Sequence, residues 1–209
     1  MGAFLQGLTL GAVYVMPIGA QNIFVINTAL TQKRSRTLLT AFIVFIFDVI
    51  LSIGCFFGIG AIMQTSPWIE LSVLGLGSFI VIWIGFSIFR DKSAMDDNGN
   101  NTNTDISLSK IITTACVVTW FNPQALIDGS MMLGAFRSSL PGQAGTLFIT
   151  GVCTASFLWW FGMSSFVSLF KSKMSNKVLR GINIVCGTII MGYGVKLLIS
   201  FVQMAANVF

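Results

Sequence analysis

The chain has 209 residues, of which 55% are apolar and only 9% are charged, and its mean hydropathy is +0.85. A soluble domain carries roughly 25% charged residues, so this composition excludes a water-exposed globular protein and indicates an integral membrane protein. The net charge of +5 does not indicate nucleic-acid binding, because eleven of the twelve basic residues lie in connections between apolar segments.

Six segments are apolar and long enough to cross a bilayer, which takes about 20 residues. The first has no basic residues before it and continues past signal-peptide length, so we expect a retained helix. The pattern predicts an all-α membrane protein with six transmembrane helices. The predicted spans are residues 3–28, 38–63, 68–89, 109–136, 143–170 and 179–203.

Polar, helix-breaking residues interrupt the first span at 16–22, Met-Pro-Ile-Gly-Ala-Gln-Asn. Pro17 and Gly19 predict a break, because proline lacks an N–H and clashes with the preceding turn. The half-helix that follows presents unpaired N–H groups and a partial positive charge, which suit a substrate carboxylate. Gln21 and Asn22 can add neutral hydrogen bonds to the same site.

The second span contains an acidic residue, Asp48, about 10 residues or roughly 15 Å from the start of that span. A charged carboxylate at the bilayer centre costs about 2.5–3.5 kcal/mol on insertion scales. Asp48 must therefore face a cavity, pair with a cation or remain protonated. We expect it to bind substrate or carry a proton; the alternative is a structural hydrogen bond to the backbone of a nearby broken helix.

A polar, turn-rich stretch at residues 91–108 separates the third and fourth spans and predicts a cytoplasmic linker. It divides a single membrane domain, residues 1–209, into two three-helix repeats, residues 1–90 and 109–209. Because three is an odd number, such repeats would be inverted relative to each other. Transporters built in this way hold their substrate near the bilayer midplane.

A second break is predicted inside the fourth span, in Thr-Trp-Phe-Asn-Pro-Gln-Ala-Leu-Ile-Asp at 119–128. Pro123 begins a new half-helix, and the residue before it, Asn122, is forced out of helical geometry. Asn122 and Gln124 offer amide groups, and Asp128 is the second acid inside a span. A plain proline kink is the alternative for either break alone.

The two breaks correspond in position. Pro17 and Pro123 are separated by 106 positions, and so are Asn22 and Asp128. Irregular backbone at membrane depth is tolerated only where protein or a watery cavity covers it. Interrupted helices at equivalent positions of two halves therefore predict a transport site.

Loop charge predicts the orientation. Ten basic residues fall in the first, third and fifth connections, whereas Arg137 is alone in the second and fourth. The positive-inside rule therefore puts the odd-numbered connections in the cytoplasm and both termini outside. The ten residues are Lys33, Arg34, Arg36, Arg90, Lys92, Lys110, Lys171, Lys173, Lys177 and Arg180.

Glycines at four-residue spacing, Gly7 with Gly11 and Gly54 with Gly58, predict close helix contacts. We expect these contacts inside one chain, with a homodimer face as the alternative.

The cysteines and tryptophans have simpler interpretations. The sequence has no histidine and no CxxC pair, so we expect neither a metal nor another cofactor. Core or lipid packing is preferred for Trp159 and Trp160. A membrane thiol redox enzyme is the remote alternative, which would need cysteines beside both breaks. The four cysteines, which we expect to pack as small apolar side chains, are Cys55, Cys116, Cys153 and Cys186.

Several motifs together resemble the L-lysine exporter (LysE/ArgO) family. Pro-Ile-Gly-Ala-Gln-Asn at 17–22 resembles its first-helix motif, and Thr-Trp-Phe-Asn-Pro at 119–123 resembles its fourth-helix motif. Similar stretches in the other helices are Phe-Asp-Val-Ile-Leu at 47–51, Ser-Pro-Trp at 66–68, Ala-Ser-Phe-Leu-Trp at 155–159 and Gly-Ile-Asn at 181–183.

The resemblance implies a transporter, not an enzyme, in the bacterial inner membrane, which exports arginine or lysine in exchange for protons. It implies that Asp48 and Asp128 are the family's membrane acids. Asp48 is the first choice for proton coupling and Asp128 for the substrate ammonium, with the reverse assignment open. The chain departs from the family at Ala20, Phe47 and Gln124, which border the expected site. Export of a neutral amino acid or another small solute is the alternative.

Overall fold

The computed structural model of the chain describes residues 2–17, 19–58, 67–90, 106–140, 142–171 and 176–208. All regular structure in these residues is α-helical, which confirms the all-α prediction. The helices are α1 (Ala3–Val15), α2 (Ala20–Thr31), α3 (Arg34–Phe57), α5 (Pro67–Arg90), α6 (Leu108–Trp120), α7 (Pro123–Ser139), α8 (Gln143–Lys171) and α9 (Asn176–Val208).

Each of the six predicted spans is helical in the residues that the structure describes, and the first and fourth are divided as predicted. The axis of α1 makes an angle of 78° with that of α2 across the first break. At the second break, α6 ends at Trp120 and α7 begins at Pro123. Both interruptions in the sequence therefore end one helix and start another.

Three of the described helices are long and apolar enough to cross a membrane, and the bent pair α1–α2 would make a fourth. These three are Arg34–Phe57, Gln143–Phe170 and Arg180–Ala206. α6 has 13 residues and reaches only about 20 Å by itself, so it needs α7 to complete a crossing. The fold is that of a multi-pass membrane protein, and the number of spans remains a prediction.

Some predicted boundaries differ from the structure. The second predicted span began at residue 38, but α3 begins at Arg34, so two basic residues of this connection, Arg34 and Arg36, lie in its first helical turn after the N-cap Lys33. The sixth span was predicted to end at residue 203, whereas α9 continues to Val208. The predicted end of the second span at residue 63 and almost all of the predicted linker, residues 91–105, lie outside the described residues.

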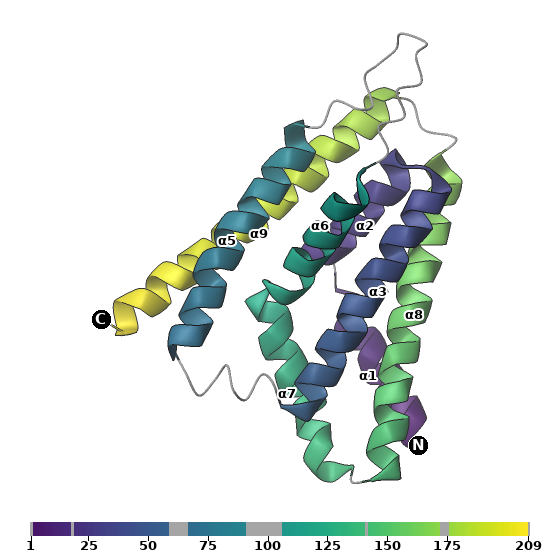
Figure 1. The fold of residues 1–209 in the computed structure, drawn as a ribbon, viewed down its shortest axis with the longest axis vertical. Helices are drawn as coiled ribbons and strands as arrows, with labels where there is room; N and C mark the ends of the chain where they lie inside the picture. The colour runs from purple at the N-terminus through teal and green to yellow at the C-terminus, as the bar shows by residue number, and fades with distance from the viewer. Residues whose placement is uncertain are drawn as a thin grey trace.

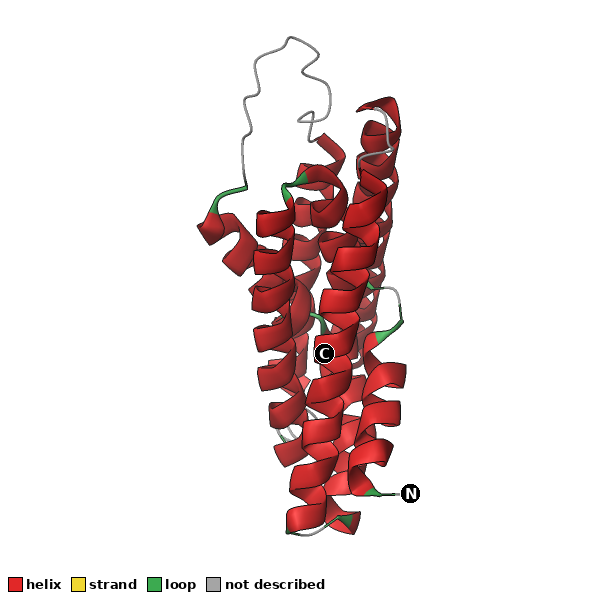
Figure 2. Cartoon of the chain, turned by 90° about the vertical axis from the view of Figure 1, so that its right-hand side faces the viewer, coloured by secondary structure: helices red, strands yellow, loops and turns green. Residues whose placement is uncertain are grey.

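The long helices α3, α5, α8 and α9 form an elongated bundle, in which α5 and α9 are inclined to α3 and α8 (Figures 1 and 2). α3 packs against α8, and the two broken helices flank this pair: α1 and α2 pack on α8, and α6 and α7 pack on α3. α5 and α9 form a second long pair at the side of the bundle (Figure 1). Asn27 Nδ2 donates to Asn183 Oδ1 at 2.6 Å and joins α2 to α9.

Glycines allow α1 to approach α8 closely. A Cβ atom at Gly7 would overlap the carbonyl group of Phe148, and one at Gly11 would lie 2.8 Å from the Cα atom of Val152. On the facing helix, a Cβ atom at Gly151 would overlap the backbone of α1. The first glycine pair therefore packs inside the chain, as predicted.

The second predicted glycine pair has a different use. Gly54 is buried in α3, but Gly58 ends that helix with a φ of 101°, and a Cβ atom there would meet no other atom within 4 Å. The prediction of a packing role for Gly58 is wrong. It is a left-handed helix cap, a conformation that favours glycine because a side chain would be strained.

Replacing Gly151 by valine is expected to destabilise the folded protein by about 1–3 kcal/mol, because the added side chain overlaps the backbone of α1. Gly162→Val is the matched control in the same helix, since a Cβ atom at Gly162 meets nothing within 4 Å. Thermal unfolding in detergent, followed by circular dichroism, should show a lower midpoint for Gly151→Val alone. Equal midpoints would contradict the tight α1–α8 contact.

Candidate functional site

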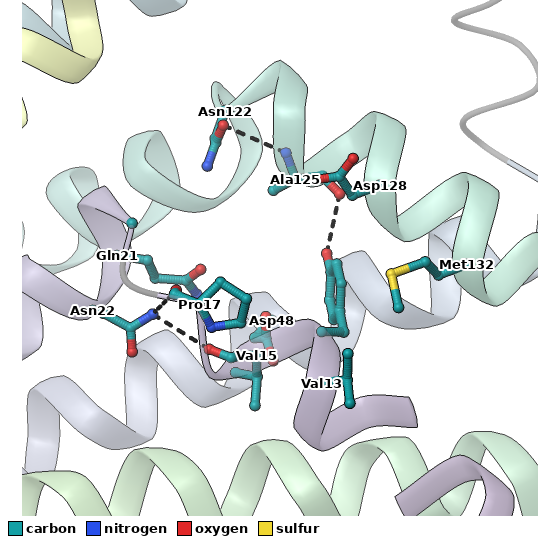
Figure 3. A pocket seen from close by; sticks show the side chains of 12 residues that line it. Val13, Val15, Pro17, Gln21, Asn22, Asp48, Asn122, Ala125, Asp128 and Met132 are labelled. Carbon is teal, nitrogen blue, oxygen red and sulfur yellow. Dashed lines mark hydrogen bonds between the residues drawn. The ribbon is translucent and has the colours of Figure 1, made fainter. Parts of the chain in front are cut away.

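Both helix breaks line one cavity of about 260 Å³ (Figure 3). This volume is just below the range of about 300–1,000 Å³ that is usual for small-molecule sites. Two of the lining residues are acids and none is Lys or Arg, so the cavity suits a small cation. The lining residues are Val13, Tyr14, Val15, Pro17, Gly19, Gln21, Asn22, Asp48, Asn122, Ala125, Asp128 and Met132.

The first break is held by the side chain of Asn22. Its Nδ2 donates to the carbonyl oxygens of Val15 at 3.3 Å and Pro17 at 2.8 Å, groups that the interrupted helix leaves without a partner. Its Oδ1 accepts from Trp159 Nε1 at 2.7 Å, and because an indole N–H can only donate, this bond fixes the orientation of the amide. Asn22 lines the cavity, but its hydrogen bonds stabilise the break.

The second break is formed by Asn122 and Pro123. Asn122 is the N-cap of α7, and its Oδ1 accepts from the Ala125 N–H at 3.4 Å. Pro123 follows at the start of the helix, where a missing N–H leaves no hydrogen bond unmade. Gln124 lies in the same first turn, but its side chain is outside the described part of the structure, so its role stays a prediction.

Asp48 is buried in the middle of α3, with 2% of its surface exposed. Ser156 Oγ donates to Asp48 Oδ2 at 2.5 Å, and Trp160 Nε1 lies 3.5 Å from the same oxygen. Both donors belong to α8, so the carboxylate is held at the α3–α8 interface. Sequence reasoning missed these partners, although their four-residue spacing places them on one face of a helix.

Gln21 brings an unused donor to the cavity. Its amide lies beside Asp48, but the buried Nε2 atom has no well-aligned hydrogen bond with any residue that the structure describes. A buried donor without a partner costs about 1–3 kcal/mol. A bound solute or water in the cavity would remove that cost.

Asp128 lies in the second turn of α7 and is partly exposed on the cavity wall. One turn earlier, the carbonyl oxygen of Ala125 accepts a hydrogen bond from Tyr14 Oη at 3.1 Å, which joins α1 to α7. Tyr14 was not among the predicted site residues. Its position in the last turn of α1, just before the first break, is the signal that could have identified it.

The structure therefore brings together residues that are far apart in the chain. Asp48, Asp128, Gln21, Asn22 and Asn122 all line the cavity, as do Pro17 and Gly19. That these residues bind substrate or couple protons stays a prediction.

Known proteins resemble this chain over most of its length. The family model described as LysE type translocator matches residues 12–201. The arginine exporter protein ArgO of Escherichia coli (strain K12) is 33% identical over 190 residues, which cover 89% of this chain and 88% of that protein. Proteins of the same name from Salmonella schwarzengrund (strain CVM19633) and Klebsiella pneumoniae (strain 342) are 32% identical over the same shares of each chain. No solved structure matches the chain.

Proposed function

The chain belongs to the LysE family of translocators, which makes it a membrane transporter and not an enzyme, and on this premise we propose that it exports basic amino acids, arginine foremost. The observation that carries the proposal is the cavity in which two helix breaks and two carboxylates meet, with no basic residue among the lining residues that the structure describes. Relatives named as arginine exporters support the choice of arginine.

An amino acid has a carboxylate and an ammonium group, and the cavity offers a partner for each. The N-terminus of α2 receives the carboxylate, because its N-cap is Gly19, which has no side chain to satisfy the first N–H groups. Gln21 Nε2 adds the unused donor beside it. Asp128, on the opposite wall, attracts the ammonium or guanidinium group of a basic substrate (Figure 3).

Asp48 is the proposed proton carrier. It is more buried than Asp128, and its described partners are the neutral donors Ser156 and Trp160. A carboxylate so placed is more easily neutralised by a proton than by a fixed cation. Uptake of a proton at Asp48 in exchange for an exported cation would drive export by the proton-motive force.

The proposed architecture is six spans in two inverted three-helix repeats, residues 1–90 and 109–209, joined by a linker at 91–108. Reciprocal packing supports it, since the broken helix of each half packs on an unbroken helix of the other. The ends of α2, α5 and α8 lie at one end of the bundle (Figure 1). With their basic connections in the cytoplasm of a bacterial cell, both termini face outward. A homodimer remains a further prediction.

Efflux of radiolabelled arginine from cells that express the protein tests the proposal. We expect efflux that an uncoupler stops, that excess lysine slows, and that a neutral amino acid such as leucine leaves unchanged. Competition by leucine but not by lysine would favour the alternative, a neutral amino-acid exporter. Replacing all four cysteines with alanine should leave efflux intact, because a transporter of this kind needs no thiol; loss of activity would favour the redox alternative.

A further inference from the structure

On one side of the two breaks, three helices meet around a single phenol group. Tyr14, from the last turn of α1, donates from Oη to the carbonyl oxygen of Ala125 in α7 at 3.1 Å. A Cβ atom at Gly129 would lie 2.9 Å from that Oη atom and 3.0 Å from the Sγ atom of Cys55 in α3. The absence of a side chain at Gly129 is what allows the phenol to reach α7.

Further contacts between α3 and α7 lie farther from the cavity, toward the end of the bundle where α7 connects to α8. Cys55 is 1% exposed, and its Sγ lies 3.8 Å from the carbonyl oxygen of Leu126. Farther along, the guanidinium of Arg137 lies 4.7 Å from the ring centroid of Phe57 and 5.5 Å from that of Phe56. These contacts join α3 to α7 on this side of the first cavity, around a second cavity of about 350 Å³ whose lining includes Cys55 and Arg137.

We propose that Tyr14 is the gate residue on this side of the amino-acid site, and that its hydrogen bond to Ala125 breaks each time a substrate leaves. The inference rests on the proposed function, whose orientation makes this side the outer one. Tyr14 is suited to the role because α1 ends one residue later, at a break with an angle of 78°. Movement of α1 about this break would lift the phenol from Gly129 without deforming either helix.

Cys55 is a native reporter for the gate, because it touches the Gly129 position and is buried in the closed state. The test uses the full chain with the other three cysteines replaced by alanine, in intact cells exposed to a membrane-impermeant, cationic methanethiosulfonate. Tyr14→Phe removes one oxygen atom and one hydrogen bond, so we expect Cys55 to be labelled about two to ten times faster than in the parent.

Gly162→Ala in α8 is the control, because a Cβ atom at Gly162 would meet nothing within 4 Å. It should leave the labelling rate unchanged. Unchanged labelling in Tyr14→Phe would overturn the gate, and so would faster labelling that appears only in inside-out vesicles. Arginine efflux is measured separately, so a parent protein that exports no arginine would overturn the proposed function while the labelling still decides the gate.

Discussion

Replacing Asp48 by asparagine is expected to reduce net, proton-driven export of arginine roughly 30-fold or more, the factor that corresponds to about 2 kcal/mol for a lost buried charge interaction. The protein should remain folded, because asparagine has nearly the same shape as aspartate. The Oδ1 atom of an asparagine at position 48 can still accept hydrogen bonds from Ser156 Oγ and Trp160 Nε1, the two donors that hold the carboxylate. Net efflux from cells, compared at equal amounts of protein in the membrane, measures the effect.

Exchange of internal for external arginine separates the two roles that Asp48 could have. Such exchange requires no net movement of protons, so a variant that has lost only the proton carrier should keep it. Ser156→Ala is the matched control, since it removes the 2.5 Å hydrogen bond and keeps the carboxylate. We expect net export by this control to fall by about ten-fold at most. Net export by Asp48→Asn at the rate of the unaltered protein would exclude Asp48 as proton carrier.

The sequence predicted the elements of the cavity well because the bilayer makes each of them conspicuous. A proline, an amide or an acid inside a span must be compensated, so Pro17, Pro123, Asp48 and Asp128 stand out without any alignment. The 106-residue offset added a reason to associate the two breaks. The structure then places residues of both breaks on the wall of one cavity.

The contacts that hold the site could not be predicted in the same way. Trp159 was expected to pack in the core or against lipid; it packs against the core and also donates to Asn22 across 137 positions of sequence. Tyr14 reaches Ala125 across 111 positions. Such contacts depend on how each helix is rotated about its axis. That rotation is set by close packing at residues such as Gly7, which hydropathy does not reveal.

The wrong prediction at Gly58 has a different cause, which is the uncertain position of a helix end. Four-residue spacing of glycines is typical of helix packing, but the spacing is equally compatible with a glycine that ends the helix. Whether the last glycine of a span packs or caps depends on where the helix stops. Helix ends are the least certain part of a prediction from sequence.

Replacing Asp128 by asparagine is expected to weaken arginine binding, raising the KM for arginine roughly 10- to 100-fold in net export and in exchange alike. A hydrogen bond to a charged group contributes about 1.5–3 kcal/mol, and Asp128 is the acid on the more open wall of the cavity. Asp128→Glu is the control, because it keeps the charge on a longer side chain and should retain part of the affinity. The KM values from initial rates of efflux at graded internal arginine measure the change.

Asp48→Asn and Asp128→Asn together decide which acid binds the cationic group of the substrate and which carries the proton. If Asp128 binds the cationic group and Asp48 carries the proton, Asp128→Asn impairs exchange and net export equally, whereas Asp48→Asn spares exchange. The opposite pattern would reverse the assignment, and it would place the cationic end of the substrate at the α3–α8 interface, beside Ser156 and Trp160. Loss of exchange in both variants would mean that the substrate contacts both carboxylates, so that proton and substrate compete for the same pair of acids. In that case coupling would need no separate proton site, because a cation and a proton could not occupy the pair together.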